Sequence, residues 1–163
     1  MNKRIAVLLM LGLMPWAGLH AQSQTASTTF RVSAKVQAVC EVTATDLAFG
    51  TYTSQGGAPL QGTTLLRATC TPNSSYNVGL NEGTSPGATV NARKMVSGTQ
   101  ALNYQLYSDS ARTTIWGNTP GTDTVTGVGT GLAVDHTVFG AVPPAQVVPA
   151  GDYGDTITVR VYY

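Results

Sequence analysis

The segment from Thr28 to Val42 alternates apolar and polar side chains over an unusual length. Because successive side chains of a strand point to opposite faces, the pattern predicts a strand with one apolar and one solvated face. Roughly 12 residues at about 3.3 Å each would span about 40 Å, whereas an average strand has about 5 or 6 residues. Its apolar face needs a groove, and the pattern leaves open whether this groove belongs to the same molecule or to another. The alternate apolar positions are Phe30, Val32, Ala34, Val36, Ala38, Cys40 and Val42.

The first 21 residues have the layout of a secretory signal peptide. Lys3 and Arg4 form a basic start, an apolar run from residue 5 to 16 follows, and Ala21 supplies the small residue of a cleavage site. A retained membrane anchor is the alternative, but the apolar run is too short for a stable span. We therefore expect an exported chain with a signal peptide at 1–21, an N-terminal extension at 22–39 and a folded domain at 40–163, without stable membrane insertion after cleavage.

The charge balance gives no electrostatic reason to expect a nucleic acid or an anionic membrane as partner. The sequence has 9 basic and 8 acidic residues, and without Lys3 and Arg4 the basic residues number 7. Charged residues make up 10% of the chain, compared with about 25% in ordinary soluble domains. This composition is typical of an extracellular β-protein and suggests that neighbouring molecules cover much of its surface.

Cys40 and Cys70 are the two cysteines of the sequence. In an exported protein with an even number of cysteines a disulfide is the default, and two free thiols are the alternative. A bridge closing a loop of about 30 residues would contribute roughly 3.5 kcal/mol. Two cysteines and His136, the one histidine outside the predicted signal peptide, do not suffice for a zinc site. The sequence therefore predicts no metal site and no cofactor.

Short strands separated by turn residues are expected along the rest of the chain. A long glycine-containing stretch at 118–131 shows no apolar periodicity and is expected to be a surface loop. Turns every 8 to 12 residues and the lack of an amphipathic helical pattern predict an all-β sandwich. The expected strands are 46–52, 61–70, 76–80, a hairpin of 90–95 and 101–107 that turns at 97–99, 112–117, 136–141 and 156–163.

The two ends of the chain complement each other. The last expected strand alternates up to residue 163, and a seven-strand immunoglobulin-like sandwich needs one more strand after it. Without that strand the domain would keep an open hydrophobic groove and an unpaired edge, which is an aggregation hazard unless covered. If the N-terminal strand of another copy filled the groove, the head-to-tail contact would produce a fibre.

Seven short segments follow one another in a specific order along the chain: LAFGTY (47–52), ATCT (68–71), YNVGL (76–80), RKM (93–95), LNYQLY (102–107), WG (116–117) and GDYGDT (151–156). Their order and spacing resemble the spore coat protein U domain family, to which the Csu-type pilins of archaic chaperone–usher fimbriae in Gram-negative bacteria belong. The resemblance extends over residues 28–163, and despite the family name it points to pili rather than spores.

The resemblance implies an all-β fold, an incomplete immunoglobulin-like β-sandwich with an N-terminal donor strand. It implies as partners a periplasmic chaperone that lends a strand, an outer-membrane usher, and other copies of the chain and related pilins. The chain would pass through the periplasm into a surface fimbrium that serves adhesion and biofilm formation. It also implies a disulfide between Cys40 and Cys70, a donor face of Phe30, Val32, Ala34, Val36 and Ala38, and an acceptor-groove edge of Ile157, Val159, Val161 and Tyr163.

Two other function classes, a hydrolase and a carbohydrate-binding module, fit the sequence less well. A hydrolase needs a nucleophile, a base and an orienting group, and a lone His136 beside Asp135 is more typical of an ordinary strand residue, so we expect no enzyme and no catalytic residue. The alternative function is a secreted monomeric β-sandwich that binds carbohydrate through Trp116, Tyr104 and Tyr107. We prefer the interpretation in which these aromatic side chains fill the core of the sandwich.

Overall fold

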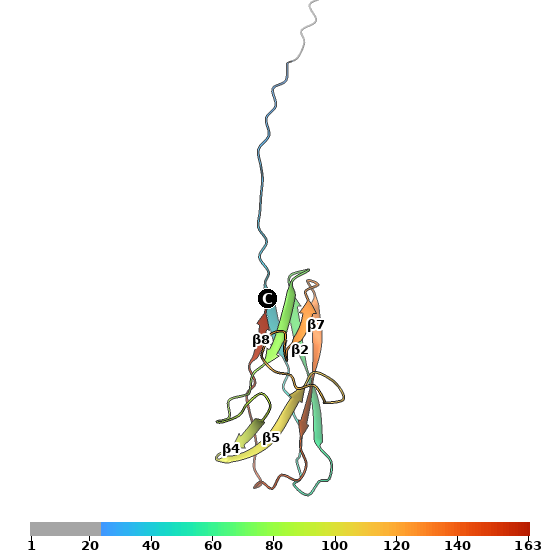
Figure 1. Ribbon diagram of the computed structural model, residues 1–163, viewed down its shortest axis with the longest axis vertical. Helices are drawn as coiled ribbons and strands as arrows, with labels where there is room; N and C mark the ends of the chain where they lie inside the picture. The colour runs from blue at the N-terminus through green and yellow to red at the C-terminus, as the bar shows by residue number, and fades with distance from the viewer. Residues whose placement is uncertain (1–23) are drawn as a thin grey trace, which may run out of the picture. The chain divides into compact units, whose positions relative to one another are not determined.

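Eight strands and no helix make up residues 24–163, the part of the chain that the computed structural model describes (Figure 1). The predicted signal peptide at 1–21 lies outside these residues. The chain divides after Lys35 into two units. In the first, residues 24–35 form no strand and have exposed side chains. The second unit, from Val36 to Tyr163, contains all eight strands.

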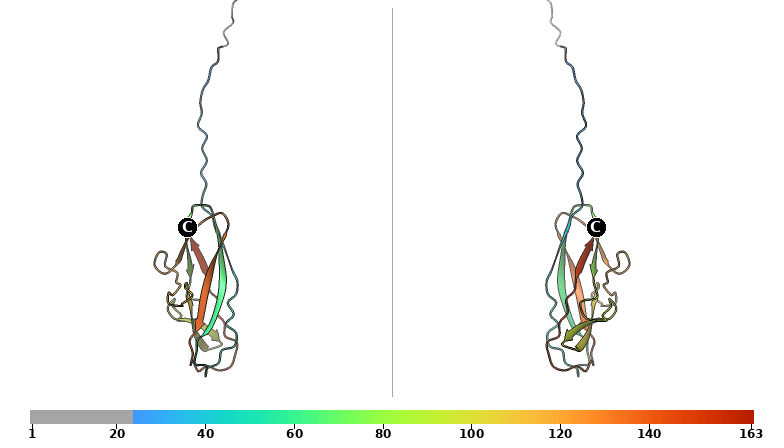
Figure 2. Two further views of the ribbon diagram at one scale, coloured as in Figure 1. Left: turned by 90° about the vertical axis from the view of Figure 1, so that its right-hand side faces the viewer. Right: turned by 90° about the vertical axis from the view of Figure 1, so that its left-hand side faces the viewer.

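The strands form two antiparallel sheets, which confirms the predicted all-β, immunoglobulin-like sandwich. One sheet has five strands in the order β1-β2-β7-β5-β4, and the other has three in the order β6-β3-β8. Strands β2 and β7 pair along ten residue positions from Leu60↔Val142 to Thr69↔Ala133, and Figure 2 shows them side by side. The strands are β1 (Cys40–Ala44), β2 (Leu60–Cys70), β3 (Ser75–Leu80), β4 (Arg93–Ser97), β5 (Gln100–Tyr107), β6 (Val125–Val128), β7 (Ala133–Val142) and β8 (Val159–Tyr162).

The core lies between the two sheets and follows from the alternation of each strand. In β2 the inward positions end in Leu66, Ala68 and Cys70, which are buried, whereas Leu65 and Arg67 on the opposite face are exposed. The apolar area removed from water in this way is the main stabilising contribution to the fold. The buried cluster consists of Leu66, Ala68, Cys70, Tyr76, Val78, Leu80, Leu102, Tyr104, Leu106, Trp116, Val138 and Val142.

Arg93 at the start of β4 is fully buried and hydrogen-bonded. Its guanidinium donates to the carbonyl oxygens of Leu80 at 2.9 Å and Trp116 at 2.8 Å, and to Gln105 Oε1 at 2.7 Å. Further bonds reach two loop carbonyls, those of Asn81 and Val90. Since β3 belongs to one sheet and β4 and β5 to the other, the bonds from Arg93 to the Leu80 carbonyl and to the Gln105 side chain join the two sheets.

Several predicted strands are present, and five segments differ from the sequence-based expectation. The expected strands at 61–70, 76–80 and 136–141 and the hairpin correspond to β2, β3, β7 and β4–β5. The long strand expected from Thr28 begins only at Cys40, since residues 24–39 form no strand. The strand expected at 156–163 is shortened to β8, which pairs with β3 over Val159–Tyr162.

The segments 46–52 and 112–117 were expected to be strands and are not. Segment 46–52 leaves the edge of β2 and inserts side chains into the core instead of pairing, and 112–117 makes one isolated bridge, Tyr107↔Ile115. The expected loop at 118–131 contains β6, in which half-buried Val125 and Gly127 alternate with exposed Thr126 and Val128. A strand of four residues within a glycine-rich stretch is too short to give a recognisable alternating pattern.

We predict that Arg93→Met lowers the free energy of unfolding by at least about 3 kcal/mol, because several buried acceptors lose their donor at about 1–3 kcal/mol each. Lys94→Met is the matched control, since the Lys94 side chain makes one exposed bond, to the Gly87 carbonyl, and its replacement should cost under about 0.5 kcal/mol. Urea denaturation of the two variants measures the difference. Equal stabilities would contradict the role given to Arg93.

Candidate functional site: a groove between two sheet edges

Strands β1 and β8 are edge strands of the two different sheets. The start of β1 and the end of β8 lie at the same end of the sandwich, because Cys40 pairs with Cys70 and Tyr162 pairs with Asn77, just after the turn that follows Cys70. Figure 1 shows β8 ending beside the start of β1. Within residues 24–163 no strand joins these two edges. One side of the sandwich is therefore left without a strand along its length.

A groove opens at this missing strand position. Its deeper part is a hollow of about 490 Å³ with buried leucine and valine side chains from both sheets at its floor. A second hollow of about 840 Å³ continues towards the end of the sandwich where β2 begins. The two hollows share Leu47, Phe49, Met95 and Tyr153, so they form one continuous groove. The floor residues of the deeper part are Leu66, Leu80, Leu106 and Val138.

One wall of the groove is the segment that leads into β8. Its side chains alternate, with Tyr153, Asp155, Ile157 and Val159 half-buried and the residues between them exposed. The Asn81 N–H donates to the Thr158 carbonyl at 3.1 Å, which continues the pairing with β3 by one residue. Because backbone groups of an antiparallel strand alternate between its two sides, the N–H and C=O groups of Ile157 and Val159 face the open edge. This edge can accept another strand.

The opposite wall is formed by β1 and the segment after it. Leu47 and Phe49 pack over a pair of glycines, Gly62 and Gly140, that face each other on β2 and β7. A Cβ atom at Gly140 would lie 2.7 Å from both side chains and would force them to shift, so glycine allows this close packing. This is why segment 46–52 anchors in the core without joining the ladder of β2.

A polar bridge crosses the apolar groove. The Tyr104 hydroxyl on β5 donates to Asp155 Oδ2 at 2.7 Å, and Thr84 donates to Oδ1 from its N–H at 2.8 Å and its hydroxyl at 3.0 Å. Gly83 has a φ of +93° and a Cβ there would collide with the Asp155 carboxylate. Burial, together with the neighbouring Asp155 carboxylate, raises the pKa of Tyr104, so its hydroxyl stays a donor at neutral pH.

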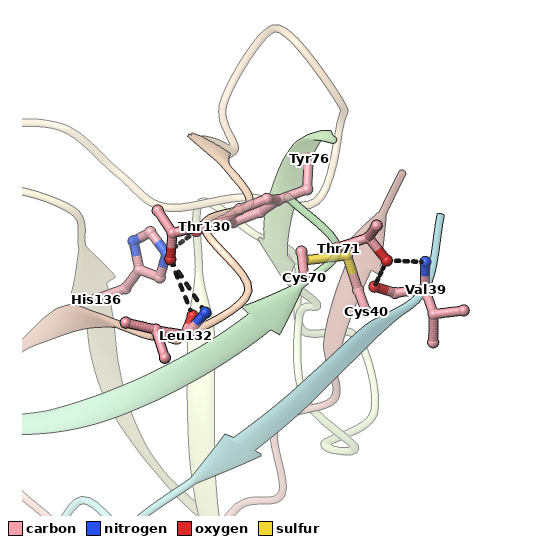
Figure 3. Close-up of a disulfide and its surroundings, with 8 residues drawn as sticks. All are labelled: Val39, Cys40, Cys70, Thr71, Tyr76, Thr130, Leu132 and His136. Carbon is pink, nitrogen blue, oxygen red and sulfur yellow. Dashed lines mark hydrogen bonds between the residues drawn. A yellow bond between two sulfur atoms is a disulfide. The ribbon is translucent and has the colours of Figure 1, made fainter. Parts of the chain in front are cut away.

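The N-terminal extension is attached to the sandwich by a covalent and a hydrogen-bonded clamp (Figure 3). Cys40 and Cys70 form a disulfide. One residue earlier, the Val39 N–H donates to Thr71 Oγ1 at 3.0 Å, and the Thr71 N–H donates to the Val39 carbonyl at 2.9 Å. The direction of β1 is thereby continued to Val39.

The residues expected to form the donor face are all exposed. Phe30 is 86% exposed, Val32 82% and Val36 84%, which are high values for large apolar side chains. Ala34 and Ala38 are exposed as well, and no residue from 24 to 39 belongs to a strand. Such side chains are ordinarily buried when a chain can bury them.

The residues expected at the acceptor edge divide into two groups. Ile157, Val159 and Val161 are half-buried and pack against the core cluster. Tyr163 is 61% exposed and lies beyond the end of β8. Sequence reasoning missed the groove floor and the Tyr104–Asp155 bridge. The position of Asp155, two residues before Ile157 and four before Val159, was the available signal for an inward-facing carboxylate.

The aromatic residues of the carbohydrate-binding alternative do not form an exposed platform. Trp116 is 1% exposed and its Nε1–H donates to the Val78 carbonyl at 2.7 Å, and Tyr104 is 5% exposed. His136 packs edge-on against Tyr76, with its Nε2 3.0 Å from the tyrosine oxygen. Between residues 24 and 163 the structure contains neither a group of three acidic, histidine or cysteine residues placed to bind a metal nor a helix that could cross a membrane.

The comparisons with known proteins agree on one family. The model of the Spore Coat Protein U domain matches residues 26–160. This chain belongs to the Spore Coat Protein U domain family. A relative in the family, Protein U of Myxococcus xanthus, is 35% identical over 158 residues, covering 88% of each chain. The resemblance found in the sequence is confirmed.

A solved structure shares the fold of this Spore Coat Protein U domain. It is a chain of the CsuC–CsuE chaperone–tip adhesion subunit pre-assembly complex from the archaic chaperone–usher Csu pili of Acinetobacter baumannii. The TM-score is 0.56 and the identity 27%, over 78% of this chain. The matched region spans 40% of the chain from Acinetobacter baumannii, so the likeness concerns part of that protein.

We predict that the protein loses stability as the pH falls from about 7 to 5, through His136. Burial lowers the pKa of His136 below its ordinary value of 6.5, so the unfolded chain binds a proton first as the pH falls. The stabilisation is complete above about pH 6.5 and decreases as the pH approaches the folded-state pKa. Urea denaturation at a series of pH values measures this slope.

The matched variants for this test are His136→Gln and Asp135→Asn. The first should flatten the dependence between pH 7 and 5, whereas the second keeps the imidazole and should retain it. The Asp135 carboxyl has its pKa lowered by Arg67 from a value of 3.8, and therefore titrates below this range. An unchanged slope in His136→Gln would show that another group is responsible.

Proposed function

We propose that the chain is a structural subunit of a chaperone–usher pilus, polymerised by strand insertion between copies. The observation that carries this proposal is the combination of an open groove and a spare strand in one chain. The groove lacks a strand between β1 and β8, and the extension presents an unpaired alternating apolar face at Phe30, Val32 and Val36. The open groove and the apolar face of the extension each expose apolar surface to water, which is unfavourable. Insertion of the extension into the groove would bury both surfaces.

The chemistry of the extension suits the groove. The floor is made of aliphatic side chains, and the inserted face would be aliphatic and aromatic, while Arg31, Ser33 and Lys35 would stay in solvent. Burying Phe30, Val32 and Val36 at roughly 1.5–3 kcal/mol each gives an upper value of about 5–9 kcal/mol. Hydrogen bonds to the open edge at Ile157 and Val159 would be added to this. Main-chain bonds with alternate side chains in pockets are the general mode of β-strand addition.

The clamp at Val39 favours insertion into another copy. The Thr71 bonds and the disulfide keep the root of the extension in line with β1, and β1 is itself a wall of the groove. To enter its own groove, the extension would have to reverse direction just before the clamp, and the residues of that turn would be lost from the inserted strand. A second copy offers the same groove without this cost. The resulting head-to-tail contact does not close and produces a fibre.

The remaining assignments are part of the same proposal. Residues 1–21 would direct export, 22–39 would be the donor segment and 40–163 the pilin domain. A periplasmic chaperone would cover the groove until an outer-membrane usher adds the subunit to the fibre, which then serves adhesion and biofilm formation at the cell surface. The similarity to a chain of a chaperone–subunit complex supports this pathway.

We predict that the double variant Phe30→Asp/Val32→Asp forms no fibres, because two carboxylates would have to enter an apolar groove. Negative-stain electron microscopy and the ladder of oligomers on gels of unheated samples measure polymerisation. The matched control, Arg31→Asp/Ser33→Asp, introduces the same residues on the opposite face and should still polymerise. Fibres of normal length from Phe30→Asp/Val32→Asp would refute the donor assignment.

A further inference from the structure

The polar bridge between Tyr104 and Asp155 lies inside the groove that the proposed function assigns to an incoming strand. On the basis of that function, we propose that this bridge sets the register of the inserted strand by admitting only a small side chain, Ala34 of the incoming copy, opposite Asp155. The inserted strand would then run antiparallel to β8. The argument rests on the shape of the groove, the order of side chains in the extension and the position of the clamp.

The groove becomes shallower at Asp155, where the Tyr104–Asp155 bridge forms part of the lining of the deeper hollow. Tyr104 projects from the floor strand β5 and reaches the wall, because its hydroxyl lies 2.7 Å from Asp155 Oδ2. The Phe49 ring packs edge-on against Tyr104 with 6.1 Å between the ring centroids. The bridge therefore occupies part of the space between floor and wall at this level. A branched side chain placed there would collide with the tyrosine or press methyl groups against a hydrogen-bonded carboxylate, which is unfavourable.

The extension offers two small residues on its apolar face, Ala34 and Ala38, between larger ones. The wall also has a period of two, with Tyr153, Asp155 and Ile157 facing the groove. Since inward residues of paired strands lie opposite each other, one of the two alanines must face Asp155. The registers that place Val32 or Val36 there are disfavoured by the shallow groove.

The clamp selects between the two alanines. With Ala38 opposite Asp155, Cys40 of the incoming copy would lie opposite Tyr153, inside the acceptor groove. Cys40 is bonded to Cys70 and begins β1, so a whole sandwich would have to enter with it. With Ala34 opposite Asp155, Cys40 lies four residues further towards the end of the groove, opposite Pro149 in the outer hollow, so less of the incoming sandwich meets the acceptor.

The direction follows from the two ends of the sandwich. The extension of each copy leaves at the end where β1 starts, which is also where β8 finishes. A strand parallel to β8 would bring the incoming sandwich to that same end, onto the root of the acceptor's own extension. An antiparallel strand places the incoming sandwich at the opposite end, where the outer hollow lies. Each copy then contacts one neighbour at each of its two ends.

This register pairs Phe30 with Val159, Val32 with Ile157 and Val36 with Tyr153. Phe30 and Val32 then lie over the deeper hollow, whose floor is aliphatic. Ser33 lies opposite Thr156, and both face solvent. Because Ile157 turns its backbone groups to the open edge, Ser33 and Thr156 form a non-hydrogen-bonded pair with Cα atoms about 4.5 Å apart. That spacing is within the range that a disulfide accepts.

The test is disulfide cross-linking between copies in fibres of the full chain. Ser33→Cys/Thr156→Cys should give a ladder of covalent oligomers on non-reducing gels that collapses on reduction. Ser33→Cys/Thr158→Cys and Ser33→Cys/Gly154→Cys report the two neighbouring registers and should cross-link at least about tenfold less. Thr156 and Thr158 are exposed, and a Cβ at Gly154 meets nothing within 4 Å, so the three pairs are equivalent in accessibility.

A second pair of variants tests the selection by size. Ala34→Leu should reduce the yield of fibres about tenfold or more, as overpacking by about 1–3 kcal/mol would. Ala38→Leu, at the outer end of the strand, should polymerise nearly as the unchanged protein does. Equal yields from the two variants would overturn the role of the bridge.

The outcomes separate the register from the function. If fibres form and the strongest cross-link is at Thr158 or Gly154, or at none of the three positions, the register is wrong and strand insertion stands. If the unchanged chain forms no fibres under conditions of chaperone-assisted assembly, the proposed function fails and the register fails with it. A cross-link confined to Ser33 and Thr156 supports both.

Discussion

The absence of a strand between β1 and β8 is the constraint on which the rest of the structure depends. Both strands are sheet edges. No strand pairs with both of them among the described residues, so a groove between them opens onto the side chains of the core. Backbone groups at Ile157 and Val159 and aliphatic side chains beneath them are thus available to the same partner. A sandwich built in this way needs one more strand to complete its core.

The attachment of the extension and the joining of the two sheets depend on different residues. Cys40–Cys70 and the Val39–Thr71 bonds fix where the extension begins, and Arg93 joins the sheets from the inside without help from the open side. The domain therefore has its own buried polar and covalent supports although its hydrophobic core is open. Stability of the sandwich and readiness for a partner strand come from different residues.

The sequence predicted the fold class, the disulfide and several of the strands, such as β2 and β7, whereas the longest alternating segment, from Thr28, forms a strand only from Cys40. The sequence-based prediction failed where side-chain packing, and not strand pairing, positions the backbone. Segment 46–52 is held by Leu47 and Phe49, which pack over Gly62 and Gly140. This contact joins residues that are far apart in the sequence. The groove floor could not be predicted for the same reason, since Leu66, Leu80 and Val138 come from three strands. The spacing between Asp155 and Ile157 indicated that the Asp155 carboxylate faces inward, but nothing in the sequence indicated that Tyr104 is its hydrogen-bond partner.

The most direct measurement of the missing strand is the thermal stability of the purified chain in the presence of a synthetic peptide of residues 24–39. Completion of the groove predicts a saturable rise in melting temperature, with about 2.7 kcal/mol of stabilisation at a peptide concentration of 100 times its Kd. The same peptide with Val32→Asp and Val36→Asp should have no effect. A melting temperature that stays constant up to millimolar concentrations of the unchanged peptide would contradict an open groove that accepts this strand.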